Sequence, residues 1–341
     1  MQPHRTGSQG CIRSGRRGGA GLVSTEVNET GRLVGRDFWD VRHGHHTREQ
    51  AHGKPPRLRI RRYLDLVRTR VGAQSSETYS QYLARKVFAA HLPVREDWLC
   101  LEVGCAPGRN LVRFNRLFGY RPWGVEYSPA GAQNARDTLV SSGFDPSTII
   151  EADFFDQKFH RDYAGRFNVV LSLGFIEHFD DPACVVREHV DLIAPGGFLV
   201  CAIPNLRGWG YPFLALYARD LLSAHNCEIM RLRPFQRLFE GTELEERFCG
   251  YVGTWGVFGM SLRHERSFRG YLACAIDRAN DLLSHAAFLF LRGRAAESAW
   301  SPGLLYIGQR SACPATPATR ERGAAPSFRR GPERVPQGET P

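Results

Sequence analysis

The feature that most constrains this chain is a regular alternation of short apolar runs and amphipathic segments through its middle. The apolar runs at 98–104, 122–126, 147–151, 167–173 and 198–203 have the length and composition of buried strands, and segments of helical periodicity separate most of them. Parallel strands need such crossover helices, so this order predicts an open α/β sheet with helices on both faces. Ligands bind such sheets beyond the carboxyl ends of the strands, so the residues directly after each strand should carry the function.

Small and acidic residues stand at these strand ends. After the first strand, the small residues at 104, 106 and 108 let the backbone pass close to a ligand, and the following helix presents its N-terminus there. Glu126 ends the second strand, where a carboxylate can accept hydrogen bonds from ribose hydroxyls. Asp153 and Phe154 follow the third strand, and a polar acceptor beside an aromatic ring suits an adenine. The order of these residues favours a nucleotide-like ligand, although the first loop departs from the Gly-x-Gly-x-x-Gly dinucleotide spacing.

Five segments carry a resemblance to a known family. In chain order, LEVGCAPGRNL, GVEYSPAG, EADFF, FNVVLSLGFIEHFDDP and LIAPGGFLVCAIPN resemble the motifs of class I S-adenosylmethionine-dependent methyltransferases, in particular the small-molecule, methyltransferase type 11/12/23-like branch. The resemblance covers residues 75–205 well and runs more loosely to 310. It implies a Rossmann-like seven-stranded sheet whose last strand is antiparallel, with S-adenosyl-L-methionine as cofactor. Ala106 departs from the family, which more often has glycine, and its methyl group is tolerated if the backbone φ is negative.

The resemblance also implies a cofactor site. Glu126 would hold the ribose, while Asp153 and Phe154 would recognise adenine. The implied cofactor-binding residues come from the helix before the first strand and from the loops after four strands: Tyr82, Glu102, Gly104, Cys105, Ala106, Gly108, Asn110, Glu126, Tyr127, Asp153, Phe154, Leu173, Gly174 and Phe175.

The methyl-transfer position is expected after the fourth strand. Gly174 and Phe175 would line the floor beneath the sulfonium, with Tyr79 or Tyr82 covering it. A hydroxyl acceptor calls for a general base, and His178 is the nearest side chain with a suitable intrinsic pKa. The alternative for His178 is a purely structural role, because a Glu-His pair recurs here in family members with unrelated substrates.

An aromatic-rich insertion follows the fifth strand. Residues 205–241 are expected to form a helical lid over the acceptor, and the alternative is a helical flap packed on the core. The candidate substrate-binding residues are His178, Asn205, His225 and Asn226. A further apolar helix over 268–291 is expected to cover one face of the sheet.

Positive charge is concentrated at the two ends of the chain. Residues 1–70 hold 15 Lys and Arg against six Asp and Glu, an excess of nine, and residues 312–341 add two, so 71–311 carry a net charge of −1 out of a total of +10. Both ends are rich in Gly, Pro, Ser and Arg, which predicts disordered tails over 1–55 and 312–341 around a methyltransferase domain at 56–311. A short basic helix over 56–71 is expected to lie in solvent or to dock on the domain or on an anionic partner.

Several classes of protein are disfavoured. The sequence contains no run of 18 apolar residues, so no transmembrane segment is predicted. No apolar stretch follows the charged N-terminus, so no secretory signal is predicted either. The nine cysteines are scattered without metal-ligand spacing, so neither a disulfide framework nor a metal site is expected, and a cytoplasmic location is the simplest. The histidines in HGHHTREQAH (43–52) are expected to bind metal only adventitiously.

The predicted function is methylation of a small molecule, with a hydroxyl of a sugar, phenol or natural-product or glycolipid intermediate as the acceptor. No specific nucleic-acid partner is expected, since the Arg-rich charge belongs to the tails and no Asn-Pro-Pro-Tyr type motif follows the fourth strand. The alternative is an RNA- or protein-directed methyltransferase that uses those tails for binding. Deletion of residues 1–55 would separate the two hypotheses, and the oligomeric state stays open.

Overall fold

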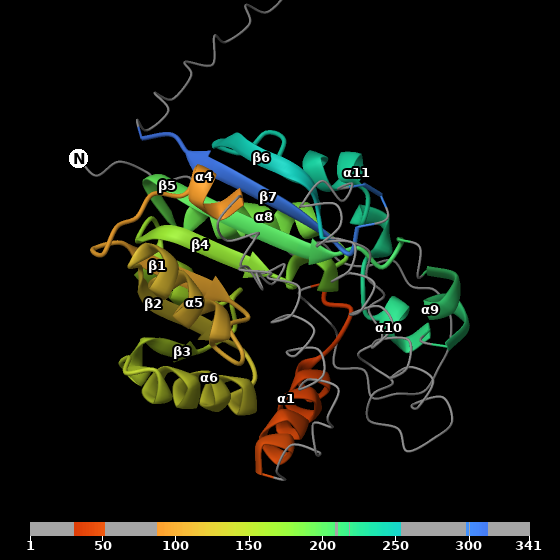
Figure 1. Ribbon diagram of the computed structural model, residues 1–341, viewed down its shortest axis with the longest axis horizontal. Helices are drawn as coiled ribbons and strands as arrows, with labels where there is room; N and C mark the ends of the chain where they lie inside the picture. The colour runs from red at the N-terminus through yellow and green to blue at the C-terminus, as the bar shows by residue number, and fades with distance from the viewer. Residues whose placement is uncertain are drawn as a thin grey trace, which may run out of the picture.

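The computed structural model describes residues 31–51, 87–208, 211–217, 219–253, 298–299 and 301–312 (Figure 1). These residues form one seven-stranded sheet flanked by helices. The helix expected before the first strand falls in a stretch that is described only from residue 87, and α4 (Ala89–His91) begins two residues later. The helices expected over 56–71 and 268–291 lie outside the described residues.

The sheet has the predicted Rossmann-like arrangement. Its strands lie in the order β3-β2-β1-β4-β5-β7-β6; β7 runs antiparallel to both neighbours, and the pairs among β1 to β5 are parallel. The chain moves outward from β1 to β3 and then returns to place β4 on the other side of β1. Ligands bind at such a reversal, so the carboxyl ends of β1 and β4 mark the site. The strands are β1 (Leu99–Val103), β2 (Arg121–Glu126), β3 (Ile149–Glu151), β4 (Phe167–Leu173), β5 (Ile193–Pro204), β6 (Leu244–Val252) and β7 (Gly303–Arg310).

The central strands are apolar throughout because both of their faces are buried. In β4, Val170 belongs to the core cluster that also contains Val185 of α8 (Pro182–Asp191). Its neighbours Val169 and Leu171 point to the opposite face, into the cluster beneath α5 (Arg109–Phe118). Side chains alternate along a strand, so a run without polar residues can only lie between two layers of helices.

A side-chain cap fixes the start of the crossover helix that follows β2. Ser128 caps α6 (Pro129–Ser141), and its hydroxyl accepts a hydrogen bond from Gly131 N at 3.1 Å. The sequence analysis missed α7 (Gln157–Tyr163), which Asp156 caps and which buries only Phe159. One buried residue in seven leaves no apolar periodicity to detect.

Short helices form the insertion between β5 and β6. They are α9 (Tyr211–Tyr217), α10 (Arg219–Ser223), the 3-10 turn η4 (Cys227–Ile229) and α11 (Leu232–Arg237). In Figure 1, α9 and α10 lie beyond the carboxyl ends of the parallel strands, whereas α11 lies near β6 and β7. Phe235 of α11 is fully buried in the core and stacks edge-on with Phe239. The second half of the insertion is therefore part of the core.

The N-terminal region requires a correction. Residues 1–55 were expected to be a disordered tail, but residues 36–51 form α1 (Arg36–Ala51), which lies beside α6 (Figure 1). Asp40 accepts a hydrogen bond from the Ser128 hydroxyl, and Asn134 donates one to His43 O at 3.2 Å. Polar and aromatic contacts hold this helix on the domain, so its low apolar content did not reveal it.

One cysteine forms a disulfide bond, although the sequence predicts no disulfide framework. Cys184 is disulfide-bonded, which its scattered spacing did not suggest. Within the described ranges, the free thiols are Cys100, Cys105, Cys201, Cys227 and Cys249. No helix among the described residues is both long and apolar enough to span a bilayer.

Candidate active site

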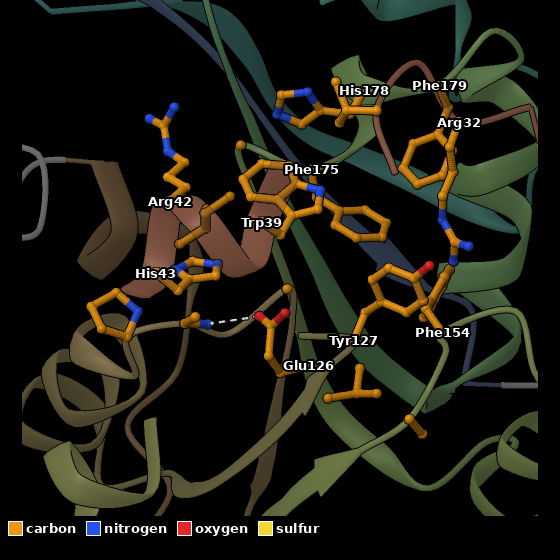
Figure 2. A pocket seen from close by; sticks show the side chains of 18 residues that line it. Arg32, Trp39, Arg42, His43, Glu126, Tyr127, Phe154, Phe175, His178 and Phe179 are labelled. Atoms are coloured by element: carbon orange, nitrogen blue, oxygen red, sulfur yellow. Dashed lines mark hydrogen bonds between the residues drawn. The ribbon is translucent and has the colours of Figure 1, made fainter. Parts of the chain in front are cut away.

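A cavity of about 200 Å³ lies at the carboxyl ends of β1, β2 and β4, at the edge that the sequence predicts (Figure 2). The loops after these strands form one side, and the segment leading into α1, together with α1 itself, forms the other. Its lining residues are Arg32, Val34, Trp39, Arg42, His43, Gly104, Ala106, Pro107, Val125, Glu126, Tyr127, Ala152, Phe154, Leu173, Gly174, Phe175, His178 and Phe179.

The structure brings most of the expected cofactor residues to this cavity. Those that line it are Gly104, Ala106, Glu126, Tyr127, Phe154, Leu173, Gly174 and Phe175. Five others lie behind the lining: Glu102, Cys105, Gly108, Asn110 and Asp153. Tyr79 and Tyr82 lie outside the described residues.

The loop after β1 passes close to the cavity because it lacks side chains at the critical points. Gly104 has φ +66°, and a Cβ there would lie 2.9 Å from Phe175 Cδ2. Gly108 caps α5 with φ 85°, and a Cβ there would lie 3.1 Å from Ala135 O. Cys105 turns away from the cavity into the core that includes Ala132, where it acts as a small apolar filler. Glycine is thus required by both backbone conformation and space.

Glu102 supports this loop from behind. Its side chain is buried, and Oε1 accepts a hydrogen bond from Asn110 Nδ2 at 2.7 Å. Oε2 has no hydrogen-bond partner among the described residues. Burial raises the pKa of Glu102 to about 8, although the Asn110 bond opposes the shift. The pair ties the first turn of α5 to β1 without reaching the cavity.

Glu126 faces the cavity from the end of β2. Its Oε2 accepts a hydrogen bond from Ala106 N at 3.2 Å, shown in Figure 2, and its Oε1 accepts one from Ser128 N at 2.9 Å. Burial raises the pKa of Glu126, while these backbone N–H groups act to lower it. Each oxygen keeps a second lone pair for a ligand, so the two backbone bonds fix a carboxylate that can still accept from neighbouring hydroxyls.

The residues expected to recognise adenine have an unexpected neighbour. Asp153 forms an ion pair with Arg32, and its Oδ1 also accepts from Phe155 N at 2.9 Å. The Arg32 guanidinium lies 4.5 Å from the centre of the Tyr127 ring, in cation–π geometry. Arg32, and not Asp153, is therefore the charged side chain that meets the cavity, while Phe154 lines it as expected.

The segment after β4 forms the opposite wall. Gly174 has φ +79°, which turns the chain into the 3-10 turn η3 (Ile176–His178). His178 Nδ1 lies 2.7 Å from Ala224 O; a carbonyl only accepts, so Nδ1 carries the hydrogen and Nε2 the lone pair. Burial lowers the pKa of His178 to about 3, with neighbouring His225 and Arg42 contributing. His178 is thus neutral and lines the cavity as expected.

The other substrate candidates lie behind this wall. The Asn205 amide donates to Ala299 O at 3.0 Å and to Ser301 O at 2.8 Å, so both of its hydrogens are used to join β5 to the start of β7. Asn226 caps η4 and donates to Phe179 O at 3.2 Å. Neither amide lines the cavity.

His225 has a different position. Its ring centre lies 4.4 Å from that of His178, so the insertion contacts the cavity wall through these two imidazoles. Burial lowers the pKa of His225. Asn226 reaches the cavity wall only through the backbone of Phe179, whereas His225 meets the side chain of a cavity residue.

The sequence analysis missed the residues that α1 and the preceding segment contribute. Trp39 stacks on His43, with ring centres 5.9 Å apart, and meets His178 edge-on at 4.9 Å (Figure 2). Leu33 N donates to His178 O at 2.8 Å, which joins this segment to the loop after β4. The signal was available: an aromatic pair at Phe38 and Trp39 is unusual in a stretch otherwise typical of disorder.

The arrangement fits S-adenosylmethionine. A buried carboxylate at Glu126 faces the cavity from the end of β2, where ribose hydroxyls would bind. The loop at Gly104 has no room for a side chain and lets backbone approach a ligand. The aromatic rings of Phe154 and Tyr127 offer flat surfaces for a purine.

Comparison with known proteins agrees with this fit. A family described as "Methyltransferase domain" matches residues 74–248. Tocopherol O-methyltransferase from Arabidopsis thaliana is 32% identical over 101 residues, which are 29% of this chain and 28% of that protein. Ubiquinone biosynthesis O-methyltransferase from Aromatoleum aromaticum is 26% identical over 186 residues, 50% of this chain and 74% of that one.

The chain therefore spans less than a third of one of these relatives and about three quarters of the other. Among solved structures, geranyl diphosphate C-methyltransferase from Streptomyces coelicolor has a TM-score of 0.44 and 16% identity, over 68% of this chain and 79% of that one. That similarity is too low to support any inference about substrates. The family match covers about half of the chain, and its motifs end at the cavity that fits the cofactor. The chain belongs to the methyltransferase domain family, and its cavity fits S-adenosylmethionine as the cofactor.

Proposed function

We propose that this enzyme methylates a hydroxyl oxygen of a small aromatic molecule of phenol type. The observation that carries the proposal is the aromatic enclosure of the cavity: Trp39, Phe175 and Phe179 all line it around His178. Flat aromatic walls favour a planar acceptor, and a cavity of about 200 Å³ has no room for a folded polymer. The names of two relatives, both O-methyltransferases, support oxygen as the target.

The residues would divide the work of binding and orientation. Glu126 would accept hydrogen bonds from the ribose hydroxyls, and Tyr127 with Phe154 would hold the purine. When bound, S-adenosylmethionine supplies an activated methyl group on a sulfonium sulfur. The protein's task is then to align the acceptor oxygen and to deal with its proton.

His178 would contact the acceptor hydroxyl. Its Nε2 lone pair can accept a hydrogen bond and orient the oxygen. A pKa near 3 makes this imidazole a weak base, so His178 alone would remove little of the barrier by proton abstraction. We assign it to orientation of the acceptor.

The insertion has a proposed role as well, and the charge distribution argues against a nucleic-acid substrate. The helices α9 and α10, beyond the strand ends, would lid the acceptor site. Residues 71–311 carry a net charge of −1, so this part of the chain offers no excess of positive charge to a nucleic acid.

The test is a methyl-transfer assay with labelled S-adenosylmethionine and the full chain. Simple phenols, sugars, RNA and a basic protein would be offered in parallel, with calorimetric binding of S-adenosylhomocysteine as the check that the cofactor site is intact. We expect label in the phenols. Label that enters only RNA or protein, in a salt-dependent manner, would show that the tails direct the enzyme to a polymer.

A further inference from the structure

Three side chains with metal-binding atoms, two buried and one half-buried, meet at the wall of the cavity. They are Glu177 and His178, from the turn after β4, and His225, which follows α10 in the insertion. One ligand atom from each lies within 4.8 Å of those of the other two. Glu177 is 1% exposed and His178 is 7% exposed, so this is not a chance grouping of surface charges. These residues lie outside both the cysteines and the histidine-rich stretch at 43–52, the two sequence features considered for metal binding.

Both imidazoles are held in the form that binds a metal. Nδ1 of His178 lies 2.7 Å from Ala224 O, and Nδ1 of His225 lies 2.6 Å from Leu221 O. Each Nδ1 must donate, because a carbonyl only accepts, and each Nε2 therefore carries a lone pair. A backbone carbonyl that fixes the far nitrogen in this way is the usual support of a metal-binding histidine.

The buried carboxyl group of Glu177 has a hydrogen bond from its own backbone N–H but is only partly satisfied. Its Oε2 has no hydrogen-bond partner among the described residues, and its Oε1 lies 3.9 Å from His178 Nε2. That separation is too long for a hydrogen bond, so a proton shared with His178 does not explain the arrangement.

The distances suit a small divalent ion after a modest contraction. A tetrahedral Zn²⁺ with bonds of about 2.1 Å needs ligand atoms roughly 3.4 Å apart. Glu177 Oε1 and His178 Nε2 are 3.9 Å apart, and all three ligand atoms lie within 4.8 Å of one another. Movements of about one ångström or less at side-chain ends would close the site.

We propose that Glu177, His178 and His225 bind a divalent ion of the Zn²⁺ class, whose fourth position faces the cavity and takes the acceptor hydroxyl. This second half rests on the proposed function, and in it the acceptor oxygen binds the ion instead of donating a hydrogen bond to His178 Nε2. The acceptor oxygen forms a bond to the metal, its O–H bond breaks, the proton leaves to water, and the oxygen keeps the electron pair with which it attacks the methyl group.

The proposal selects an acidic hydroxyl over a sugar alcohol. A phenol is within reach of ionisation by Zn²⁺ near neutral pH, whereas an alcohol starts several pKa units higher. Arg42 also lines the cavity and lies close enough to His178 and His225 to lower the pKa of both. The same positive charge would stabilise a phenolate beside the metal.

The histidine-rich stretch at 43–52 offers a rival metal site that the experiment must remove. The background protein therefore carries His45→Ala, His46→Ala and His52→Ala and keeps His43, which lines the cavity. This full-length variant is stripped with a chelator and titrated with Zn²⁺ by calorimetry and with Co²⁺ by visible absorption. We expect one equivalent of tight binding and the absorption of four-coordinate Co²⁺.

Two single substitutions in this background test the ligands. Glu177→Gln and His225→Ala should each weaken Zn²⁺ binding about 100-fold or more, because each removes a direct ligand. The matched control is Glu188→Gln, which alters another Glu–His pair, with Glu188 Oε2 3.5 Å from His160 Nε2, that belongs to no compact three-ligand cluster among the described residues. It should leave Zn²⁺ binding unchanged. Calorimetric binding of S-adenosylhomocysteine verifies that every variant is folded.

The outcomes separate this inference from the proposed function. Zn²⁺ binding that disappears with the tail histidines, or that survives both Glu177→Gln and His225→Ala, overturns the metal site even if S-adenosylhomocysteine binds and phenols are methylated. Loss of Zn²⁺ binding in both variants supports the site even if no phenol is methylated. A change in the Co²⁺ spectrum with phenol but not with cyclohexanol supports the acceptor position, and no change with either overturns that half.

Discussion

The two sides of the cavity are built in different ways. The cofactor side consists of strand ends and tight loops, in which Gly104, Ala106 and Glu126 lie within 22 residues of one another and are joined by backbone hydrogen bonds. The covering side joins Arg32 and Trp39 to the loop after β4 and to His225 of the insertion. The first is local in sequence, and the second depends on contacts across the whole chain.

The difference between the two sides indicates which of them determines specificity for the acceptor. The cofactor side meets a ligand through backbone and one carboxylate, features that any member of the fold can supply. The covering side brings distinctive side chains, Arg32, Trp39, Arg42 and His178, around the remaining space. Changes to the first should impair cofactor binding, and changes to the second should alter how the acceptor is enclosed.

Removal of the cover should have the largest effect. Deleting residues 1–51 takes away Arg32, Trp39 and Arg42 and opens the cavity to water, so kcat/KM for a phenol should fall about 1000-fold, or roughly 4 kcal/mol. Deleting only residues 1–30 keeps all of these side chains and should change the rate about twofold or less. Deletion of residues 1–55 would remove α1 together with the tail, so these two deletions are the better test. Equal kcat/KM values for the two truncated proteins would show that residues 31–51 do not enclose the acceptor.

Substitution of Glu126 should weaken cofactor binding. Glu126→Ala removes the acceptor for the ribose hydroxyls and leaves the N–H groups of Ala106 and Ser128 unsatisfied. We expect the Kd for S-adenosylhomocysteine, measured by calorimetry, to rise about 100-fold, or roughly 3 kcal/mol. Glu151→Ala, at the exposed end of β3, is the control and should bind normally. Unchanged affinity for Glu126→Ala would mean that the ribose is held elsewhere.

A methyl group at Gly104 should test how tightly the two sides meet. Gly104→Ala must adopt φ +66° and place a carbon 2.9 Å from the Phe175 ring, which should lower the free energy of unfolding by about 2–3 kcal/mol. Gly143→Ala has a similar φ of +83° with no atom within 4 Å of the added carbon, so it reports the backbone strain alone, about 1 kcal/mol. Equal losses in urea unfolding would show that Phe175 moves aside freely.

The smallest effect concerns pH. Burial lowers the pKa of His189 to about 4, below its unfolded value near 6.5, and its ring packs on Phe154 and Phe175. The unfolded state therefore binds more protons between these values, so this group's contribution is complete above about pH 6.5 and is lost as the pH falls towards 4. From about pH 7 to pH 5.5 the loss should be about 1 kcal/mol.

His189→Leu should remove this slope. The difference between the unfolding free energies of wild type and variant should shrink by that amount as the pH falls. A difference that stays constant with pH would show that His189 is protonated equally in both states.

The sheet could be predicted closely because each of its strands is defined by neighbouring residues. The expected strand at 167–173 coincides with β4, and the expected end of β2 at Glu126 is correct. The ordered N-terminal segment and α7 could not be predicted in this way. α7 buries a single residue, and α1 is held by polar and aromatic partners far along the chain.

The positions of the candidate site residues were also predicted only in part. Glu126 lines the cavity as expected, because a strand end places its last side chain at the sheet edge. Asp153 occupies its expected loop, but its carboxylate pairs with Arg32, 121 residues away. Asn205 was expected near the acceptor, but its amide joins β5 to the segment before β7. The roles proposed for these residues in binding await the experiments above.

By itself, the sequence determined the α/β sheet, the family and the sheet edge at which the cavity lies, because strand periodicity and tight glycine turns are properties of a few consecutive residues. Only the tertiary structure decided which side chains close the cavity. Arg32, Trp39 and the Glu177–His178–His225 cluster meet because the loop after β4, the insertion and α1 converge at one sheet edge. Convergence of distant segments depends on the packing of the whole chain, which leaves no periodic trace in any one of them.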